Sequence, residues 1–242
     1  MADIRVVFSG ALGRMGRALV PGLRAAEGIA LVAETDKDDD LAAAIKKSKA
    51  HVVVDFTVPK SAMDNARIIL KSGVQGVIGT TGFTEADLDA LDQESRRAKR
   101  GLLVAPNFAL GMVLMQKFAD EAVKHFPRVE IVEAHQENKA DAPSGTALRT
   151  AERLATAGAK PPPAGEAPSL GLDLAGVRVH SLRLPGLVAR QEIHFGAPGE
   201  ALVLRHDALS RDCYLPGVLA AIRAIPGQVG LLRGLESILF PR

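Results

Sequence analysis

The stretch IRVVFSGALGRMG, residues 4–16, decides the fold of this chain. Its first half is a mostly apolar run, typical of a strand that is buried on both faces of a parallel sheet. Gly10, Gly13 and Gly16 follow, at the point where a helix is expected to begin. Glycines at such a turn let the backbone approach a pyrophosphate, whose charge meets the free N–H groups of the helix start. The stretch therefore predicts a dinucleotide-binding loop; the alternative is a tight turn without a ligand.

Four more apolar runs follow, separated by segments with helical spacing, which indicates a parallel α/β sheet. They read IALVAE (29–34), HVVVDF (51–56), VQGVIG (74–79) and GLLVA (101–105). Glu34 ends the first of these runs, about where an acidic residue binds the ribose hydroxyls of a dinucleotide. Ligands of such sheets bind outside the carboxyl ends of the strands, so we expect GTTGF (79–83) and APNF (105–108) beside the nicotinamide.

The pattern changes after residue 106. A helix is expected at about 111–125, then a strand, a helix after Gly145, several strands in a row within 177–208, and a helix at about 212–224. We therefore predict an α/β protein: a Rossmann-like parallel sheet domain, and a second α+β domain built on a mixed or antiparallel sheet.

Composition narrows the function classes. The chain has 242 residues, of which 47% are hydrophobic, and a net charge of +2. This balance gives no single-sign field that would indicate a nucleic-acid or anionic-membrane partner. No apolar run approaches the roughly 20 residues of a membrane-spanning helix. Cys213 is the only cysteine, and MADIRVVFSG does not resemble a signal peptide, so we expect a cytoplasmic protein.

The segment EAHQENKADAPSGT, residues 133–146, gathers polar side chains at the end of a predicted strand. His135 closes the strand, Lys139 follows in a loop, and Ser144 leads into a helix. A helix start offers N–H donors to an anion, and a lysine adds a formal charge. The segment is therefore suited to binding a carboxylate.

Three other interpretations of this segment are a hydrolase triad, a metal site and a helix-capping loop. A hydrolase triad of Ser144, His135 and Asp141 lacks the strained nucleophile elbow of such enzymes. His135, Glu137 and Asp141 have no recognised metal-ligand spacing, so no metal site is expected. A plain polar loop that caps a helix explains Glu137 and Asn138 well, but explains His135 together with Lys139 poorly.

Taken in order, GALGRMG, DFT (55–57), GTTGF, APNF and EAHxxxKxDAPSGTA resemble the dihydrodipicolinate reductase family, also called 4-hydroxy-tetrahydrodipicolinate reductase, over nearly the whole chain. The resemblance implies a dinucleotide-binding domain of residues 1–108 plus 212–242, a substrate-binding and oligomerisation domain of residues 109–211, and a homotetramer. It also implies an NAD(P)H-dependent oxidoreductase that reduces 4-hydroxy-tetrahydrodipicolinate to tetrahydrodipicolinate in lysine and diaminopimelate biosynthesis.

Matched by position, the resemblance makes His135 the acid/base histidine and Lys139 the proton donor. It makes Gly145 and Thr146 the substrate-binding pair, and we expect Gln136 and Ser144 to bind the substrate beside them as hydrogen-bond donors. The cofactor contacts that it implies are Gly10, Ala11, Leu12, Gly13, Arg14, Met15, Glu34, Gly79, Thr80, Thr81, Ala105, Pro106, Asn107 and Phe108. Gln136 departs from the family, which commonly has a second histidine there; glutamine donates a hydrogen bond but cannot carry a proton charge.

NADH is expected to serve at least as well as NADPH. The stretch ETDKDDD carries negative charge that disfavours a 2′-phosphate, and Thr35 stands where NADPH-using relatives often carry an arginine. Two rivals to the reductase remain: another Rossmann dehydrogenase acting on a small carboxylate, and a nucleotide-binding homologue that has lost turnover, which Gln136 favours.

Overall fold

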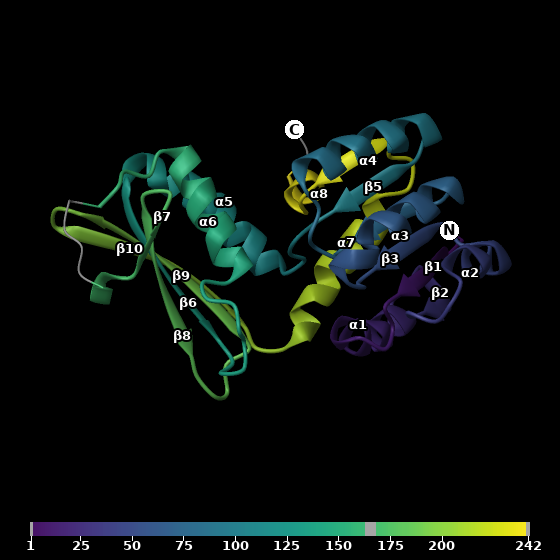
Figure 1. Ribbon diagram of the computed structural model, residues 1–242, viewed down its shortest axis with the longest axis horizontal. Coiled ribbons are helices and arrows are strands. Elements are labelled where there is room, and N and C mark those ends of the chain that lie inside the picture. The colour runs from purple at the N-terminus through teal and green to yellow at the C-terminus, as the bar shows by residue number, and fades with distance from the viewer. Residues whose placement is uncertain (1, 163–167, 241–242) are drawn as a thin grey trace. The chain divides into compact units, whose positions relative to one another are not determined.

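The computed structural model describes residues 2–162 and 168–240, which divide into two compact units (Figure 1). The first unit comprises the described residues up to Leu110 and from Arg211 onward, and the second comprises those within Gly111–Ser210. The roles predicted for the two domains stay a prediction. Among the described residues, no helix has the length and apolar character needed to cross a membrane.

A parallel six-stranded sheet forms the centre of the first unit, with the strand order β11-β5-β4-β3-β1-β2. Its strands are β1 (Ile4–Ser9), β2 (Ile29–Thr35), β3 (Val52–Asp55), β4 (Gln75–Ile78), β5 (Gly101–Val104) and β11 (Gly230–Arg233). The five strands predicted from apolar runs are confirmed. The sixth, β11, was not predicted, because its four residues GLLR are too few to show a pattern.

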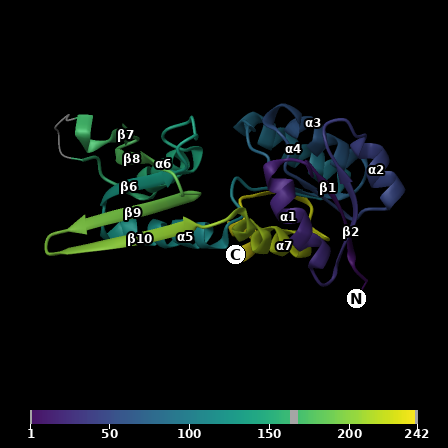
Figure 2. The ribbon, with the colours of Figure 1, turned by 90° about the horizontal axis from the view of Figure 1, so that it is seen from below.

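Helices cover both faces of this sheet (Figure 2). The helices of the unit are α1 (Arg14–Ala25), α2 (Leu41–Ser48), α3 (Pro59–Lys71), α4 (Glu85–Ala98), α7 (Leu215–Ala224) and α8 (Glu236–Leu239), with the 3-10 turn η2 (Arg211–Tyr214) before α7. Helices α2, α3 and α4 lie on one face, and α1 and α7 lie on the other. The predicted Rossmann-like arrangement is therefore confirmed.

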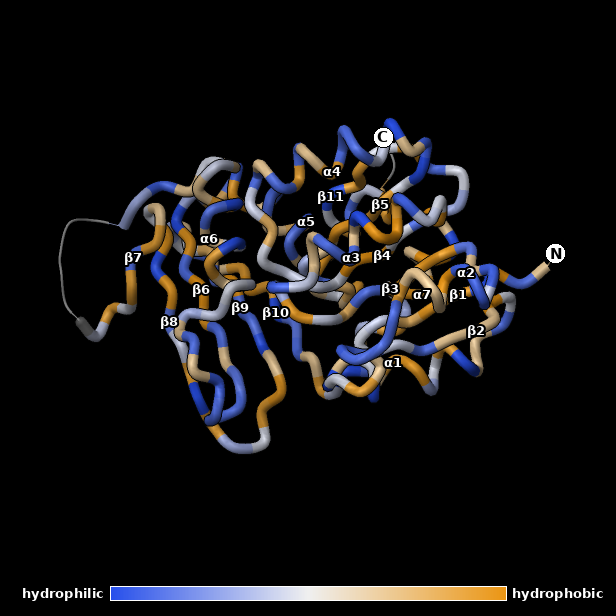
Figure 3. The backbone as a smooth tube through the Cα atoms, turned by 45° about the vertical axis from the view of Figure 1, so that its right-hand side comes forward, coloured by the Kyte–Doolittle hydropathy of each residue, from blue (hydrophilic) through white to orange (hydrophobic). Residues whose placement is uncertain are grey.

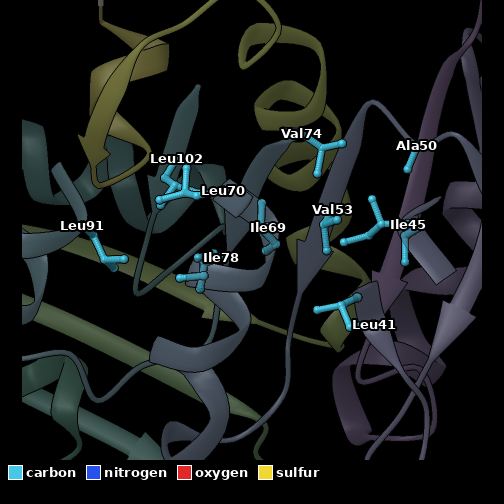
Figure 4. Packing of buried hydrophobic residues seen from close by; sticks show 12 residues of the cluster. Leu41, Ile45, Ala50, Val53, Ile69, Leu70, Val74, Ile78, Leu91 and Leu102 are labelled. Carbon is cyan, nitrogen blue, oxygen red and sulfur yellow. The ribbon is translucent and has the colours of Figure 1, made fainter. Parts of the chain in front are cut away.

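The core under α2, α3 and α4 is aliphatic (Figure 4). Val53, Ile69 and Leu102 are fully buried there, and they come from β3, α3 and β5. The hydropathy colouring of Figure 3 is largely hydrophobic along the central strands and alternates along the covering helices. Continuous apolar strands between amphipathic helices are what a sheet covered on both faces requires.

The second unit is built on a mixed five-stranded sheet with the order β10-β9-β6-β8-β7. Its strands are β6 (Arg128–His135), β7 (Leu172–Leu174), β8 (Val177–Arg183), β9 (Ala189–Ala197) and β10 (Glu200–Ala208). Among the strands that the structure describes in this sheet, only β6 and β8 pair in parallel; the other three pairings are antiparallel. This sheet lies within the predicted class of a mixed or antiparallel sheet. A 3-10 turn, η1 (Pro168–Leu170), precedes β7.

Two helices complete this unit, α5 (Leu110–His125) and α6 (Gly145–Ala157). Arg153 of α6 binds Asp120 of α5 through a two-pronged ion pair, with its shortest contact at 2.6 Å. Thr150, 1% exposed, accepts hydrogen bonds at 3.0 Å from Gln116 of α5 and from Gln191 of β9. Helix α6 is thus fixed to both the sheet and α5, which fixes the position of its N-terminus.

Candidate active site

The glycine loop after β1 is closely packed against the next loop of the sheet. Gly10 has a φ of +89°, and a β-carbon there would stand 2.4 Å from the carbonyl oxygen of Phe56. A β-carbon on Gly16 would stand 2.3 Å from the carbonyl oxygen of Ala11. Gly13 is the N-cap of α1 and brings no capping side chain to it. The main-chain N–H groups of the first turn of α1 are therefore available to an anion.

Three of the segments predicted to contact the cofactor meet around Phe56. Besides the contact with Gly10, a β-carbon on Gly79 would lie 2.1 Å from the ring of Phe56. That ring stacks on Phe8 at a centroid distance of 6.0 Å and packs at a tilt against Phe108, 5.5 Å away. The loops that follow β1, β4 and β5 are thus brought together at the carboxyl edge of the sheet, as ligand binding to this fold requires.

A buried carboxylate organises the loops after β3 and β4. Asp55 is fully buried and accepts hydrogen bonds from the hydroxyls of Thr80 at 2.5 Å and Thr57 at 2.9 Å, and from the side-chain amide of Asn65 at 2.7 Å. The Thr80 hydroxyl also accepts from the main-chain N–H of Thr57 at 2.8 Å. The side chain of Thr80, 5% exposed, therefore serves the loop itself, whereas Thr81 is exposed.

Two acidic residues near the end of β2 have different partners. Glu34 forms an ion pair at 2.5 Å with Arg24 in the last turn of α1. Asp36, two residues further on, accepts a hydrogen bond at 2.8 Å from the main-chain N–H of Leu12 in the glycine loop. Hydrogen bonds from the main-chain N–H groups of Lys37 and Leu12 lower the pKa of Asp36, so this carboxylate is ionised. The structure thus brings Asp36, which the sequence reasoning passed over, to the glycine loop.

Other predicted cofactor residues fall into exposed and buried groups. Arg14 and Pro106 are exposed, whereas Ala105 and Phe108 are buried and can contact a ligand only where their main chain reaches the surface. Asn107 accepts a hydrogen bond from the N–H of Ala109 at 2.8 Å, at the entry to α5. Met15 is half-buried in α1.

Thr35, which the expectation about cofactor choice named, is buried. Its side chain is only 4% exposed, and its hydroxyl has no hydrogen-bond partner among the described residues. Its carbonyl oxygen accepts from the N–H groups of Gly10 and Ala11 at 2.8 and 3.1 Å. The side chain of Thr35 therefore does not lie at the surface, and the role expected of this position in cofactor choice stays a prediction.

In the second unit, the end of β6 carries the residues that were predicted to be catalytic. His135 is the last residue of β6, and its side chain is 15% exposed. The turn that follows is closed by a hydrogen bond from the N–H of Lys139 to the carbonyl of Gln136 at 3.1 Å. The Lys139 ammonium lies 2.6 and 2.7 Å from the two carboxylate oxygens of Asp141, and this contact lowers the pKa of Asp141. Gln136 itself is exposed.

The start of α6, which was predicted to bind the substrate, is capped by the side chain of its own N-cap residue. Ser144, 3% exposed, is the N-cap of α6, and its hydroxyl accepts from the N–H of Ala147 at 3.2 Å. Gly145 and Thr146 form the first turn and are half-buried. The nearest atom to a β-carbon on Gly145 would be a guanidinium nitrogen of Arg149 at 3.7 Å, an ordinary contact. The fold itself therefore does not require glycine at position 145.

The geometry of this segment does not support the hydrolase triad. The Ser144 hydroxyl serves as a helix cap and the His135 ring bonds Glu133, so the two are not arranged as nucleophile and base. Within residues 2–162 and 168–240, no three His, Cys, Asp or Glu side chains form a cluster suited to a metal ion.

Glu133 begins the polar motif of residues 133–146, and the structure places its side chain against the His135 ring. Its side chain is fully buried, and it accepts hydrogen bonds from the Nδ1 of His135 at 2.5 Å and from Arg183 of β8 at 2.8 Å. Burial by itself would raise the pKa of Glu133, but hydrogen bonds from His135, Arg183 and Ser181 outweigh it and lower the pKa to about 2. A charged residue in an inward-facing register of β6 was the signal that could have identified it.

Comparison with known families covers almost the whole chain. A family model described as dihydrodipicolinate reductase, N-terminus, matches residues 4–108, and one described as dihydrodipicolinate reductase, C-terminus, matches residues 111–239. A 4-hydroxy-tetrahydrodipicolinate reductase from Moorella thermoacetica is 44% identical over 264 residues, covering 99% of each chain. One from Mycolicibacterium smegmatis is 46% identical over 244 residues, covering 98% of this chain and 99% of the relative.

Solved structures of other proteins resemble the fold of this chain. A dipicolinate-bound dihydrodipicolinate reductase from Paenisporosarcina sp. TG-14 superimposes with a TM-score of 0.89 at 35% identity, covering 98% of this chain and 99% of the other. An amine dehydrogenase from Mycobacterium smegmatis, at 14% identity and a TM-score of 0.65, shares the fold alone.

Proposed function

The chain belongs to the dihydrodipicolinate reductase family, and from this premise we propose that it reduces 4-hydroxy-tetrahydrodipicolinate to tetrahydrodipicolinate, with loss of water, using a nicotinamide dinucleotide. The reaction belongs to lysine and diaminopimelate biosynthesis. The observation that carries the proposal is that one segment, from the end of β6 to the start of α6, carries the His135 ring, the Lys139 ammonium and the N-terminus of α6.

This group suits a cyclic dicarboxylate. The first-turn N–H groups of α6, at Gly145 and Thr146, are donors for one carboxylate, and the Lys139 ammonium adds a positive charge. The dipicolinate in the solved structure from Paenisporosarcina is a compound of this chemical class. Ser144 contributes through the cap that fixes the helix start, rather than by its own hydroxyl. The exposed amide of Gln136 is a further donor within the same turn.

Lys139 and His135 are the proposed catalytic residues. When bound, the dinucleotide supplies a hydride, and the substrate gains negative charge as it accepts that hydride. Lys139 discharges this negative charge by donating a proton, which is general acid catalysis worth about 10² to 10⁴ in rate. His135 either accepts and donates protons in the site or orients the substrate anion. Asp141 holds the Lys139 ammonium in place before the substrate arrives.

The glycine loop fits the dinucleotide. Gly10 and Gly16 make contacts with main chain that leave no room for a side chain, so the turn needs glycine for its own packing, and the N–H groups in the first turn of α1 remain available to an anion. We propose that Asp36 accepts hydrogen bonds from the ribose, because it lies beside the loop and follows Gly16 by about 20 residues, the usual separation. Glu34, the residue predicted first, is held by Arg24.

The cofactor preference follows from the same residues. The ionised Asp36 repels a 2′-phosphate, whereas the exposed Lys37 and Arg14 attract it. We therefore propose that NADH serves at least as well as NADPH. A tenfold or greater preference of kcat/KM for NADPH, measured at fixed ionic strength, would contradict this assignment.

The direct test is an assay with freshly generated 4-hydroxy-tetrahydrodipicolinate, in which NADH consumption is followed by absorbance. The proposed function predicts turnover that depends on this substrate. A protein that binds NADH, by calorimetry, but shows no turnover with any small carboxylate would match the rival of a homologue that lost activity, for which Gln136 is the one feature in favour. Turnover of another carboxylate alone would identify a different dehydrogenase.

The oligomeric state and the location are proposals of the same kind. The edge strands of the second sheet are β7 and β10, and Leu172 and Val203 on them are about half exposed, at 52% and 48%. Exposed edges and apolar side chains invite pairing with other copies, and we propose a homotetramer in the cytoplasm. Light scattering at micromolar concentration should give the mass of four chains.

A further inference from the structure

The buried pair of Glu133 and Arg183 is not explained by fold stability alone. Two charges removed from water are costly, and a pair of apolar residues of similar volume often serves a core at least as well. In this sheet, the side chain of Glu133 has no exposure and that of Arg183 has 17%. Their placement directly behind both proposed catalytic residues therefore calls for a role in positioning.

Glu133 determines which nitrogen of His135 carries hydrogen. An ionised carboxylate accepts hydrogen bonds and cannot donate them. The contact of 2.5 Å between the Glu133 carboxylate and the Nδ1 of His135 therefore places the hydrogen on Nδ1. The other nitrogen, Nε2, is left to accept or donate a proton. In other carboxylate–histidine pairs, too, one ring nitrogen bonds the carboxylate and the other carries the function.

Arg183 connects the same carboxylate to the loop that carries Lys139. Its Nη2 donates to Glu133 at 2.8 Å and to the carbonyl oxygen of Asp141 at 2.6 Å. Its Nε donates to the carbonyl oxygen of Lys139 at 3.3 Å. Arg183 is paired in register with His135 across β6 and β8, so the guanidinium reaches both the strand end and the loop. The guanidinium of Arg183 thus holds the main-chain carbonyl groups on both sides of residue 140.

We propose that Glu133 and Arg183 are positioning residues of the reductase site: Glu133 holds His135 in its Nδ1–H tautomer, and Arg183 holds the loop of Lys139. This inference rests on the proposed function, because it assigns roles toward that reaction. Neither residue contacts the substrate in this account, and each acts through a catalytic neighbour.

A second histidine–glutamate pair in the same sheet provides a matched control. Glu130 and His180 lie 2.8 Å apart, with exposures of 45% and 29%. Glu130 is three residues from Glu133 on β6, so the two side chains point to opposite faces of the sheet. Glu130→Gln removes the same charge from a similar pair without touching the candidate site.

The first measurement uses the unliganded wild-type protein and needs no turnover. Protein labelled with ¹⁵N at histidine, with the His135 signals identified by their loss in His135→Gln, reports the tautomer of the neutral ring. The proposal predicts the Nδ1–H form for His135. A neutral His135 ring with its hydrogen on Nε2 would overturn the role of Glu133. This result would stand even if the Glu133→Gln variant failed to fold.

Glu133→Gln is the corresponding variant. Because its amide can also donate, His135 should lose the fixed tautomer, and kcat should fall by about 10- to 100-fold, as is typical when a partner that orients a functional histidine is lost. KM for the substrate should change by less than about threefold, since no substrate contact is removed. Glu130→Gln should leave kcat unchanged. A folded Glu133→Gln protein with an unchanged His135 tautomer and unchanged kcat would contradict the proposal.

Arg183→Lys tests the other half of the pair. It keeps the charge beside Glu133 but loses the planar fork that reaches two carbonyl groups. The His135 tautomer should remain, while amides 139–142 exchange hydrogen faster and kcat falls. Unchanged exchange and unchanged kcat would refute the role of Arg183. If the wild type shows the expected tautomer but no reductase activity, the proposed function fails, and the arrangement around Glu133 stands.

Discussion

The two units are built to recognise charge in different ways. At the edge of the first sheet, the groups proposed to bind a dinucleotide are mainly the main-chain N–H groups in the first turn of α1, which follows a loop where Gly10 and Gly16 leave no room for a side chain. At the end of β6, the groups are side chains, His135 and Lys139, each held by a carboxylate. Main-chain sites are defined by backbone shape, and side-chain sites by their supporting partners. Substitutions in the two units should therefore change different kinetic constants.

The largest effect is expected from Lys139→Ala. Loss of the proposed proton donor should lower kcat by at least about 100-fold, while KM for NADH stays nearly constant because the dinucleotide groups lie in the first unit. Steady-state kinetics with both substrates varied provides the measurement. Lys124→Ala is the control, since Lys124 forms a similar pair with Glu121, at 2.6 Å. A Lys139→Ala enzyme with near-normal kcat would remove Lys139 from the chemistry.

The second prediction concerns acid stability. The pKa of Glu133 is about 2 in the folded protein, below its ordinary value of 4.5, so its ionised form stabilises the fold. This stabilisation is fully present above pH 4.5 and is lost as the pH falls through about 2, and its size is on the order of 3 kcal/mol. The free-energy difference between wild type and Glu133→Gln, from urea unfolding, should therefore shrink across this window. A difference that does not vary with pH would contradict the low pKa.

Gly145→Ala distinguishes a ligand requirement from a folding requirement. An added methyl group meets only an ordinary contact with Arg149, so thermal stability should be unchanged or slightly higher. In the proposed site it would, however, stand where a substrate carboxylate approaches the helix start, and the weakened charged hydrogen bond should raise KM about tenfold or more. Gly196→Ala, which adds a methyl group with nothing within 4 Å, is the control. Equal substrate KM in the two variants would exclude Gly145 from the substrate site.

The smallest effect is expected in the first unit, from Asp36→Asn. The asparagine oxygen can still accept from the N–H of Leu12, but the negative charge that repels a 2′-phosphate is gone. The ratio of kcat/KM for NADPH over NADH should rise by about three- to tenfold, with kcat for NADH little changed. Asp39→Asn, which removes a charge from the same loop, should shift the ratio less. If Glu34→Gln shifted the ratio and Asp36→Asn did not, Glu34 would be the ribose residue, as first expected from the sequence.

What the sequence could predict differs between the units for a physical reason. Apolar runs and glycine spacing reflect local backbone requirements. The parallel sheet and the glycine loop could therefore be predicted from the sequence, apart from the short strand β11. The choice between Glu34 and Asp36 depends on which side chain an arginine captures, and Arg24 lies ten residues away along the chain. Glu133 and Arg183 are 50 residues apart and meet only through the pairing of β6 with β8, which no local pattern shows.

The activity of the unmodified protein tests the central claim most directly. With freshly generated 4-hydroxy-tetrahydrodipicolinate and NADH, the account predicts absorbance loss that requires both compounds, is inhibited by dipicolinate, and falls at least about 100-fold in Lys139→Ala. Retained NADH binding without any substrate-dependent turnover in the wild type would contradict it.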